Sequence, residues 1–369
     1  MTIGLLKEPA HETRVSLLAE AVATLTKKGI TVIIETGAGE KAFCHNADYE
    51  KAGAQIKART EVLSSADLIL SIHAPGPSEI NGLRSKILIG VFQPLFNAAS
   101  MKEWATAGLT VFSLDMLPRT TRAQAMDVLS SQANIAGYKA VLTAANAYGR
   151  YFPMFMTAAG SIAPAKVLIL GAGVAGLQAI ATAKRLGSVV EVFDTRPAVK
   201  EEVMSLGAKF IEVEGAADAS KAGGYAVEQS EDFMQRQKAK IAESIAKADI
   251  VITTAQIPGK KAPILITEDM IKAMRNGSVI IDLAAATGGN TPVTKNNETV
   301  NYNGVEIIGN SSLQSTMPGD ASKLYGKNVL NFLQLIITKE GTINLNWEDD
   351  LVKGSCIVHG GEVVHERVK

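Results

Sequence analysis

Three glycines follow one another at spacings of two and three residues in the segment GAGVAG, residues 171 to 176. Because glycine has no Cβ, Gly171 permits a tight turn, Gly173 lets a ligand approach the backbone, and Gly176 lets a following helix pack closely. The N–H groups of Val174 and Ala175 would then begin that helix, and the positive end of a helix favours a phosphate. The segment predicts a turn that binds the pyrophosphate of a dinucleotide.

An acidic residue follows these glycines after about 20 residues, the distance at which a carboxylate accepts hydrogen bonds from the ribose hydroxyls of NAD. That residue is Asp194, and its charge would repel the 2′-phosphate of NADP. Arg196 opposes this preference, since an arginine accommodates a phosphate, and Thr195 lies between the two. We therefore predict NAD(H) as the cofactor, with Asp194, Thr195 and Arg196 near its adenosine ribose.

Apolar runs and amphipathic stretches alternate around this segment, as strands and helices must if they are to hold the turn. The run at 167–170 reads as a buried strand, and residues 177–186 as a helix that Gly187 stops. Further strands are expected at 189–193, 209–213, 249–253, 278–283 and 305–308, with helices between them. Two strand ends should line the nicotinamide half of the site, at Thr254, Ala255, Gln256 and Leu283.

The N-terminal third shows the same alternation, with short apolar runs at 3–6, 31–35, 68–72, 87–92 and 110–114. We predict an α/β protein of two doubly wound parallel-sheet (Rossmann-like) domains, joined by crossing helices with a cleft between them. Residues 1–130 and 325–369 would form the first domain, and 131–324 the dinucleotide-binding domain. Lys7, Glu8, Arg14 and His73 stand at strand ends, where either a ligand or plain solvation explains them.

A polar loop at 119–130 precedes an apolar helical pattern that contains Tyr138. In it, Arg119 or Arg122 could meet a pyrophosphate or ribose. Gln124, Asp127 and Ser130 offer the donors and acceptors that would hold a nicotinamide carboxamide, although Asp127 and Ser130 could equally serve only as helix caps. A second long segment, 214–230, reads as a loop that closes over the cofactor with Tyr225 on its apolar face.

Composition excludes several classes of function. Lysine plus arginine and aspartate plus glutamate number 37 each, so no excess charge attracts nucleic acid or an acidic membrane. Two cysteines, Cys44 and Cys356, make no disulfide framework and favour a reduced, cytoplasmic setting. The histidines lack metal-ligand spacing, so no metal is predicted. The N-terminus lacks a signal peptide, and the most apolar window, 167–183, is too short to span a membrane.

Six segments together carry a family resemblance: KEPAHETRV at 7–15, RTTRAQAMDVLSSQANIAGYKAV at 119–141, GAGVAGLQAIATAKRLG at 171–187, VFDTRP at 192–197, GGYA at 223–226 and SLQSTMPGDAS at 312–322. In these the chain resembles the NAD(H)-binding component of proton-translocating NAD(P) transhydrogenase, which is similar to alanine dehydrogenase. The resemblance implies that Arg119, Gln124 and Asp127 hold the nicotinamide end of NAD(H), with Ser130 and Tyr138 as neighbours. It also assigns the mobile-loop tyrosine to Tyr225.

Alanine dehydrogenase is the alternative, and it needs a lysine and a histidine in the first domain. Aligned with those segments, LSIHAPGP places His73 at the lysine and VFQPLF places Gln93 or Pro94 at the histidine. Without a proton acceptor an amino acid is not oxidised, whereas hydride transfer between two nicotinamides requires only their positioning. A regulatory protein that binds NADH without transferring hydride is a third possibility.

The transhydrogenase resemblance also implies partners. The chain would present NADH to NADP⁺ on an NADP(H)-binding component, and a membrane-spanning subunit would carry the proton path. Since the chain stops where longer members continue into a membrane region, we expect a split, bacterial-type enzyme. This subunit would be a homodimer, cytoplasmic and peripheral on the inner membrane through its partners, with no membrane insertion of its own.

Overall fold

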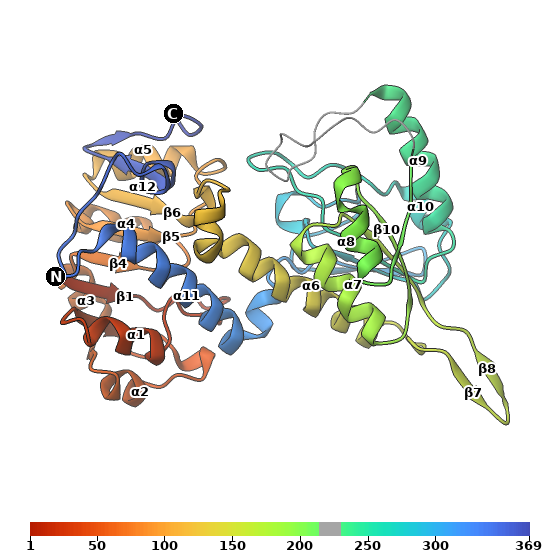
Figure 1. The fold of residues 1–369 in the computed structure, drawn as a ribbon, viewed down its shortest axis with the longest axis horizontal. Helices are drawn as coiled ribbons and strands as arrows, with labels where there is room; N and C mark the ends of the chain where they lie inside the picture. The colour runs from red at the N-terminus through yellow and green to blue at the C-terminus, as the bar shows by residue number, and fades with distance from the viewer. Residues whose placement is uncertain (214–229) are drawn as a thin grey trace. The chain divides into compact units, whose positions relative to one another are not determined.

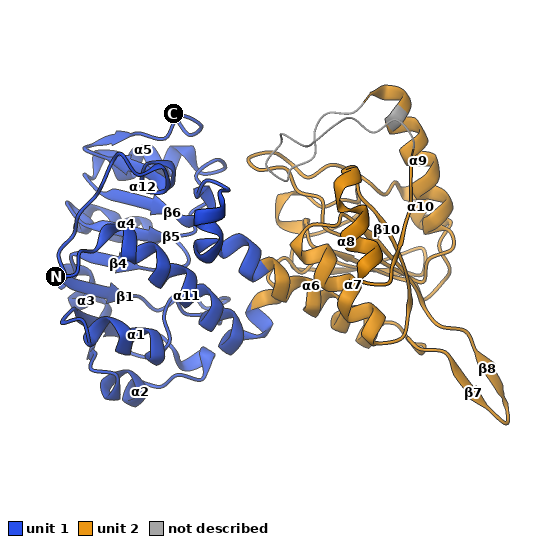
Figure 2. Ribbon diagram, in the orientation of Figure 1, with its two compact units in different colours: residues 1–132, 315–369 blue, residues 133–314 orange. Residues whose placement is uncertain are grey.

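The computed structural model describes residues 1–213 and 230–369. They divide into two compact units, residues 1–132 with 315–369 and residues 133–314 (Figure 2). These divisions fall near the expected boundaries, but residues 315–324 group with unit 1. The reason is that helix α11 (Pro318–Ile336) packs a whole apolar face into the core of that unit. The cleft expected between the domains stays a prediction.

The sheet of unit 1 has its first strand near the centre, with two strands added on one side and three on the other. From edge to edge the parallel strands are β3 (Gln55–Lys57), β2 (Thr31–Glu35), β1 (Thr2–Leu5), β4 (Leu68–Leu70), β5 (Ile87–Gly90) and β6 (Thr110–Ser113). The order of connection reverses between β1 and β4. In open α/β sheets ligands bind at the carboxyl ends of strands beside such a reversal.

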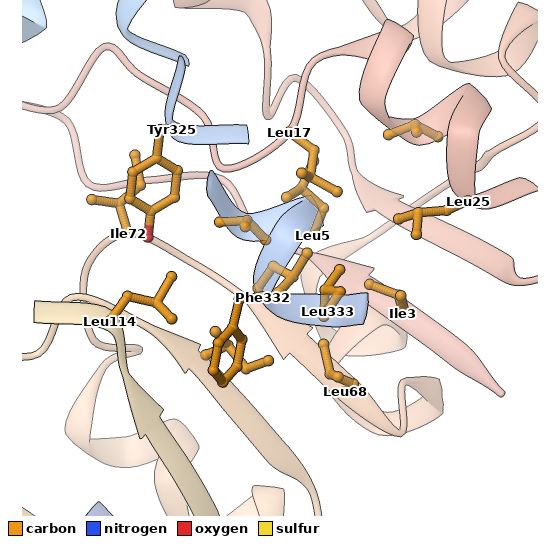
Figure 3. Packing of buried hydrophobic residues seen from close by; sticks show 14 of the residues in the cluster. Ile3, Leu5, Leu17, Leu25, Leu68, Ile72, Leu114, Tyr325, Phe332 and Leu333 are labelled. Atoms are coloured by element: carbon orange, nitrogen blue, oxygen red, sulfur yellow. The ribbon is translucent and has the colours of Figure 1, made fainter. Parts of the chain in front are cut away.

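Side chains alternate between the two faces of this sheet, and both faces are covered. Ile3, Leu5 and Leu68 belong to one core, which α11 completes with Tyr325 and Phe332 (Figure 3). The intervening side chains enter a second core on the other face. The helices that cover the sheet are α1 (Ala19–Thr26), α2 (Asn46–Lys51), α3 (Arg59–Ser65), α4 (Pro77–Ile80), α5 (Ala98–Thr106) and α12 (Asp350–Ser355).

The sheet of unit 2 repeats the same strand order. From edge to edge it contains β11 (Lys209–Phe210), β10 (Val189–Phe193), β9 (Lys166–Leu170), β12 (Ile250–Thr253), β13 (Val279–Asp282), β15 (Val305–Ile308) and the antiparallel β14 (Thr299–Tyr302). Its described helices are α7 (Val174–Arg185), α8 (Lys200–Ser205), α9 (Glu231–Ile245), α10 (Glu268–Lys272) and most of α6 (Val128–Ala147). The reversal here lies between β9 and β12, and β9 leads into the glycine turn.

The predicted α/β class with parallel-dominated sheets is confirmed, and most predicted strands lie within two residues of the observed ones. Four features were not expected: β3, β14, the regular C-terminal strands β16 (Cys356–His359) and β17 (Glu362–Val363), and a hairpin of β7 (Phe155–Thr157) and β8 (Gly160–Ile162). The tail is therefore not irregular, because β16 pairs antiparallel with β6. The hairpin extends away from the sheet of unit 2 (Figure 1).

Candidate functional site

The glycine turn adopts the geometry that its sequence predicted. Gly171 has φ +107°, a left-handed conformation that disfavours any side chain, and its N–H donates to the carbonyl of Phe193 at 2.8 Å. A Cβ on Gly176 would lie 1.9 Å from the Gly171 carbonyl oxygen, so α7 can start here only without one. A Cβ on Gly173 would meet nothing within 4 Å. The backbone at Gly173 is thus open to an incoming group at the N-terminus of α7, where Val174 is exposed.

Asp194 follows β10, as expected, but its carboxylate is already fully engaged. Oδ2 accepts from the Ala172 N–H at 2.7 Å, which ties the carboxylate to the glycine turn. Arg196 donates to the same carboxylate through its backbone N–H, Nε and Nη2 at 2.7–2.9 Å, and these hydrogen bonds raise the pKa of the arginine. The side chain of Asp194 is only 6% exposed. The repulsion expected against a 2′-phosphate therefore loses its basis in this state, because the carboxylate charge is neutralised by the adjacent arginine.

The ends of β12 and β13 are joined to the same turn. Thr254 Oγ1 lies 3.3 and 3.2 Å from the carbonyl oxygens of Leu170 and Gly171. The exposed Gln256 donates from Nε2 to the Leu283 carbonyl at 2.8 Å. Of the residues predicted for unit 2, the structure thus brings the glycines, the Asp194–Arg196 pair and these strand ends together. Thr195 is half-buried beside them.

Helix α6 contributes a residue that sequence reasoning missed. Gly137 faces the start of α7 so closely that a Cβ would lie 2.1 Å from the Ala175 carbonyl oxygen. Asn134 one turn earlier donates to Gln178 of α7 at 3.2 Å. A glycine inside a helix costs about 1 kcal/mol relative to alanine, so its presence was itself a signal of close packing. Tyr138, a predicted site residue, is the next residue and is 36% exposed.

The polar loop of unit 1 is an ordered turn on a rigid base. It forms a 3-10 helix, η4 (Thr121–Met126), whose Ala123 and Met126 are buried in the main core. Helix α11 fixes it from below, since the Nδ2 atoms of Asn328 and Asn331 both donate to the Ala125 carbonyl, at 2.8 and 2.9 Å. The intervening side chains are therefore held outward by a fixed backbone.

The side chains of this loop divide into structural and projecting ones. Asp127 caps α6: Oδ1 accepts from the Ser130 N–H at 2.9 Å and Oδ2 from its hydroxyl at 2.6 Å. Arg122 pairs with Asp349 and, at 3.2 Å, with Asp350. Arg119 is exposed, and the exposed Gln124 amide makes no side-chain hydrogen bond within the described residues. The capping role weighed for Asp127 and Ser130 is thus present, and Arg119 and Gln124 are the side chains that project.

The polar residues at the first-domain strand ends are committed mainly to one another. Glu12 accepts from Arg14 Nε and Nη2 at 2.9 and 2.7 Å, and lies 2.9 Å from His73 Nε2. Burial would raise the pKa of Glu12, but these hydrogen bonds outweigh it and hold that pKa well below its usual range. Arg14 also donates to Gln132 at 2.9 Å. A cavity of about 300 Å³ beside this network is lined in part by Lys7, Glu8 and His73.

Glu8 predicts a pH dependence of stability. Its carboxylate accepts from the N–H groups of Ile72 and His73 at 2.6 and 3.0 Å, yet burial raises its pKa from 4.5 to about 7. The folded state therefore keeps this proton to higher pH than the unfolded chain does, and stability falls as pH rises from 4.5 to about 7. The shift bounds that decline at roughly 3 kcal/mol.

We expect Glu8→Gln, which is uncharged at every pH, to remove most of this decline. Urea unfolding followed by circular dichroism at several pH values between 4.5 and 8 measures it. Glu50→Gln, on an exposed position of α2, is the control and should keep the wild-type slope. Parallel slopes for wild type and Glu8→Gln would show that another group is responsible.

Some predictions lie outside the described residues or concern absences. Tyr225 and the loop expected to close over the cofactor fall within 214–229, which the structure does not describe. In the described ranges no three His, Cys, Asp or Glu side chains gather as a metal site requires. No helix among residues 1–213 and 230–369 is both long and apolar enough to cross a bilayer.

Two family models match consecutive stretches of the chain. "Alanine dehydrogenase/PNT, N-terminal domain" matches residues 4–136, and "Alanine dehydrogenase/PNT, C-terminal domain" matches residues 140–366. The chain belongs to this family. The resemblance drawn from the six motifs is thereby confirmed at the level of the family.

Relatives of two kinds are similar to this member of the family. It is 44% identical over 364 residues to the first segment of the divided NAD(P) transhydrogenase subunit alpha of Rhodospirillum rubrum, covering 96% of this chain and 95% of the relative. The crystal structure of transhydrogenase from Sinorhizobium meliloti matches with a TM-score of 0.90 at 44% identity, over 99% of this chain and 100% of that one. "Alanine dehydrogenase 2" of Staphylococcus aureus is 29% identical over 293 residues, 78% of this chain and 73% of the relative. Transhydrogenase subunits are thus more similar to this chain than that dehydrogenase is.

Proposed function

We propose that this protein is the NAD(H)-binding subunit of an NAD(P) transhydrogenase, and that it presents NADH for direct hydride transfer to NADP⁺ on a partner subunit. The observation that carries the proposal is the 44% identity to the R. rubrum subunit along 96% of the chain. Identity of that extent includes both the glycine turn of unit 2 and the polar loop of unit 1, which are the two segments the activity would use.

The residues of unit 2 fit a dinucleotide. Gly173 leaves its backbone uncovered at the N-terminus of α7, and a Cβ there would fill the space that a pyrophosphate needs. Val174 and Ala175 begin the helix whose N–H groups would bind the phosphates. Asp194 and Arg196 would meet the adenosine ribose, and Thr254, Ala255, Gln256 and Leu283 the nicotinamide half.

The residues of unit 1 would position rather than react. When bound, NADH supplies the hydride from C4 of its nicotinamide ring. The Gln124 amide can donate to and accept from a carboxamide at the same time, and the fixed η4 backbone would let it set the orientation of the ring. Arg119 would neutralise phosphate charge, while Asp127 and Ser130 hold the start of α6 beside them. No proton needs to move on this chain, because hydride passes between two nicotinamides of the same chemistry.

An alanine dehydrogenase-like enzyme is the alternative, and the network of unit 1 disfavours it. Such an enzyme needs a group free to take the proton of the amino acid. His73 instead lies against Glu12, and Arg14 is held by Glu12 and Gln132. These side chains would have to exchange their partners for a substrate before any chemistry.

The proposal includes three partners. An NADP(H)-binding component would receive the hydride, and a membrane-spanning subunit would couple the transfer to proton movement and bring this protein to the membrane. The third partner is a second copy of the chain. The β7–β8 hairpin supports it, since Met154, Phe155 and Met156 are 43–75% exposed there, and an isolated two-stranded hairpin is marginally stable in water.

Mixing the purified protein with an NADP(H)-binding transhydrogenase component tests the activity. Reduction of an NAD analogue by NADPH, followed by absorbance, should require both proteins. A mixture without transfer would refute the proposal. Alanine-dependent NADH formation by the protein alone would establish the alternative, and NADH binding without either reaction would indicate a regulatory protein.

The Asp194–Arg196 pair gives a prediction on cofactor choice. Asp194→Asn removes the charge that holds the guanidinium, which is then available to a 2′-phosphate, so NADPH should gain at least about tenfold relative to NADH. Titration calorimetry with both cofactors measures the ratio of dissociation constants. Arg196→Ala is the matched variant and should shift the ratio toward NADH, because the carboxylate is left bare. A ratio that neither substitution changes would place the adenosine ribose elsewhere.

A further inference from the structure

Asn290 lies in the loop after β13 and uses every polar group it has. Its side chain accepts from the Ala255 N–H at 3.2 Å and donates to the carbonyl oxygens of Ala255 and Pro263 at 2.9 and 2.8 Å. Its backbone carbonyl accepts from Leu265 and Ile266 at 2.9 and 3.1 Å. The residue is fully buried. Asn290 therefore joins three chain segments at one point.

The loop that carries Asn290 is itself fixed by a buried carboxylate. Asp282, at the end of β13, accepts from the Asn290 N–H and from Thr294 Oγ1, both at 2.7 Å. Its other oxygen accepts from Thr253 Oγ1 and the Ala284 N–H at 3.0 Å. Asp282 is fully buried, so water does not compete for these bonds. The position of the Asn290 amide is thus set by the strands β12 and β13 themselves.

The consequence falls on the turn Thr254–Gln256. Asn290 occupies both the N–H and the C=O of Ala255, in the way a neighbouring strand would, and so extends the order of β12 past its last residue at Thr253. The preceding residue is tied to Gly171 and the following one to Leu283. With its two backbone groups spent on Asn290, Ala255 can touch a cofactor only through its methyl group and not by hydrogen bonds.

We propose that Asn290 is a positioning residue for hydride transfer, which acts through the backbone of Ala255 on the wall that meets the nicotinamide. This inference rests on the proposed function, because it assumes that the turn lines the reactive half of the cofactor. A wall that shifts by about 1 Å leaves the cofactor bound but misaims its ring, and a misplacement of that size costs on the order of 100-fold in rate. Asn290 itself need not touch the cofactor.

Asn290→Ala tests the proposal in the full chain. Transfer from NADPH to an NAD analogue, with an NADP(H)-binding component present, should fall at least about tenfold. The NADH dissociation constant from calorimetry should change less than about threefold, since the pyrophosphate contacts are intact. In hydrogen exchange without cofactor, the Ala255 N–H should exchange faster than in the wild type.

Thr291→Val is the matched control. Thr291 is equally buried in the same loop, and its hydroxyl bonds Thr294 and Val293 but not Ala255. It should lose similar stability while it keeps both the transfer rate and the protection of Ala255. If Asn290→Ala does not fold, Asn290→Ser carries the same comparison.

The outcomes separate the two proposals. Transfer at the wild-type rate in folded Asn290→Ala, or an equal loss in Thr291→Val, overturns the positioning role. Unchanged protection of Ala255 in Asn290→Ala overturns the hydrogen-bonded brace whatever the activity is. An absence of transfer by the wild-type protein itself is a failure of the proposed function, and exchange at Ala255 still decides whether the brace exists.

Discussion

Replacing Gln124 by asparagine is expected to slow hydride transfer by about 100-fold while NADH binding weakens less than about threefold. The shorter side chain keeps the amide but withdraws it by one methylene from a backbone that cannot follow. That backbone is held by buried Ala123 and Met126 and by the two asparagines that donate to the Ala125 carbonyl. Single-turnover kinetics with the NADP(H)-binding component and calorimetry with NADH measure the two effects.

Thr121→Ser is the control for this substitution. It removes one carbon from the same exposed 3-10 helix, and the Thr121 side chain makes no hydrogen bond within the described residues. Its transfer rate should equal that of the wild type. A large rise in the NADH dissociation constant of Gln124→Asn at unchanged turnover would mean that the glutamine contributes affinity and not orientation.

Gly173→Ala is expected to raise the NADH dissociation constant at least about tenfold without loss of stability, because its effect falls on the ligand alone. An added Cβ meets nothing in the protein within 4 Å, and φ at Gly173 is −78°, which any residue adopts. The same Cβ would occupy the space through which a pyrophosphate reaches the backbone. Calorimetry measures the affinity and thermal unfolding the stability.

Two other glycines bracket this result. Gly149→Ala adds a Cβ that also meets nothing, away from the glycine turn, and should change neither quantity. Gly176→Ala forces a Cβ to within 1.9 Å of the Gly171 carbonyl oxygen and should lose stability together with affinity. If Gly173→Ala bound NADH like the wild type, the phosphates could not lie on this turn, and the assignment of the cofactor site would fail.

The sequence predicted what depends on local pattern. A buried strand, spaced glycines and an amphipathic helix are each encoded within a few residues, so the turn at 171–176 and the start of α7 were placed correctly. The same holds for the position of Asp194 after β10. What its carboxylate does was open, because both a ribose and Arg196 were candidates for it, and only the coordinates show the arginine bound.

Features that depend on contacts distant in sequence were not predicted. Asn290 holds a residue that lies 35 positions earlier in the chain, and nothing local distinguishes it from any loop asparagine. Gly137 faces Ala175 in another helix, although a glycine within a helical pattern could have drawn attention. The C-terminal strands were missed because short β segments gain their stability from the strand they join, in this case β6.

The division of the chain also sets an order for its synthesis. Unit 2 is one continuous stretch, whereas unit 1 closes only when residues 315–369 arrive. Until then its sheet lacks α11, which supplies Tyr325 and Phe332 to the core, and strand β6 presents an unpaired edge that β16 will later cover. Such edges recruit other strands, so a nascent chain paused after unit 2 should depend on chaperones more than the finished protein does.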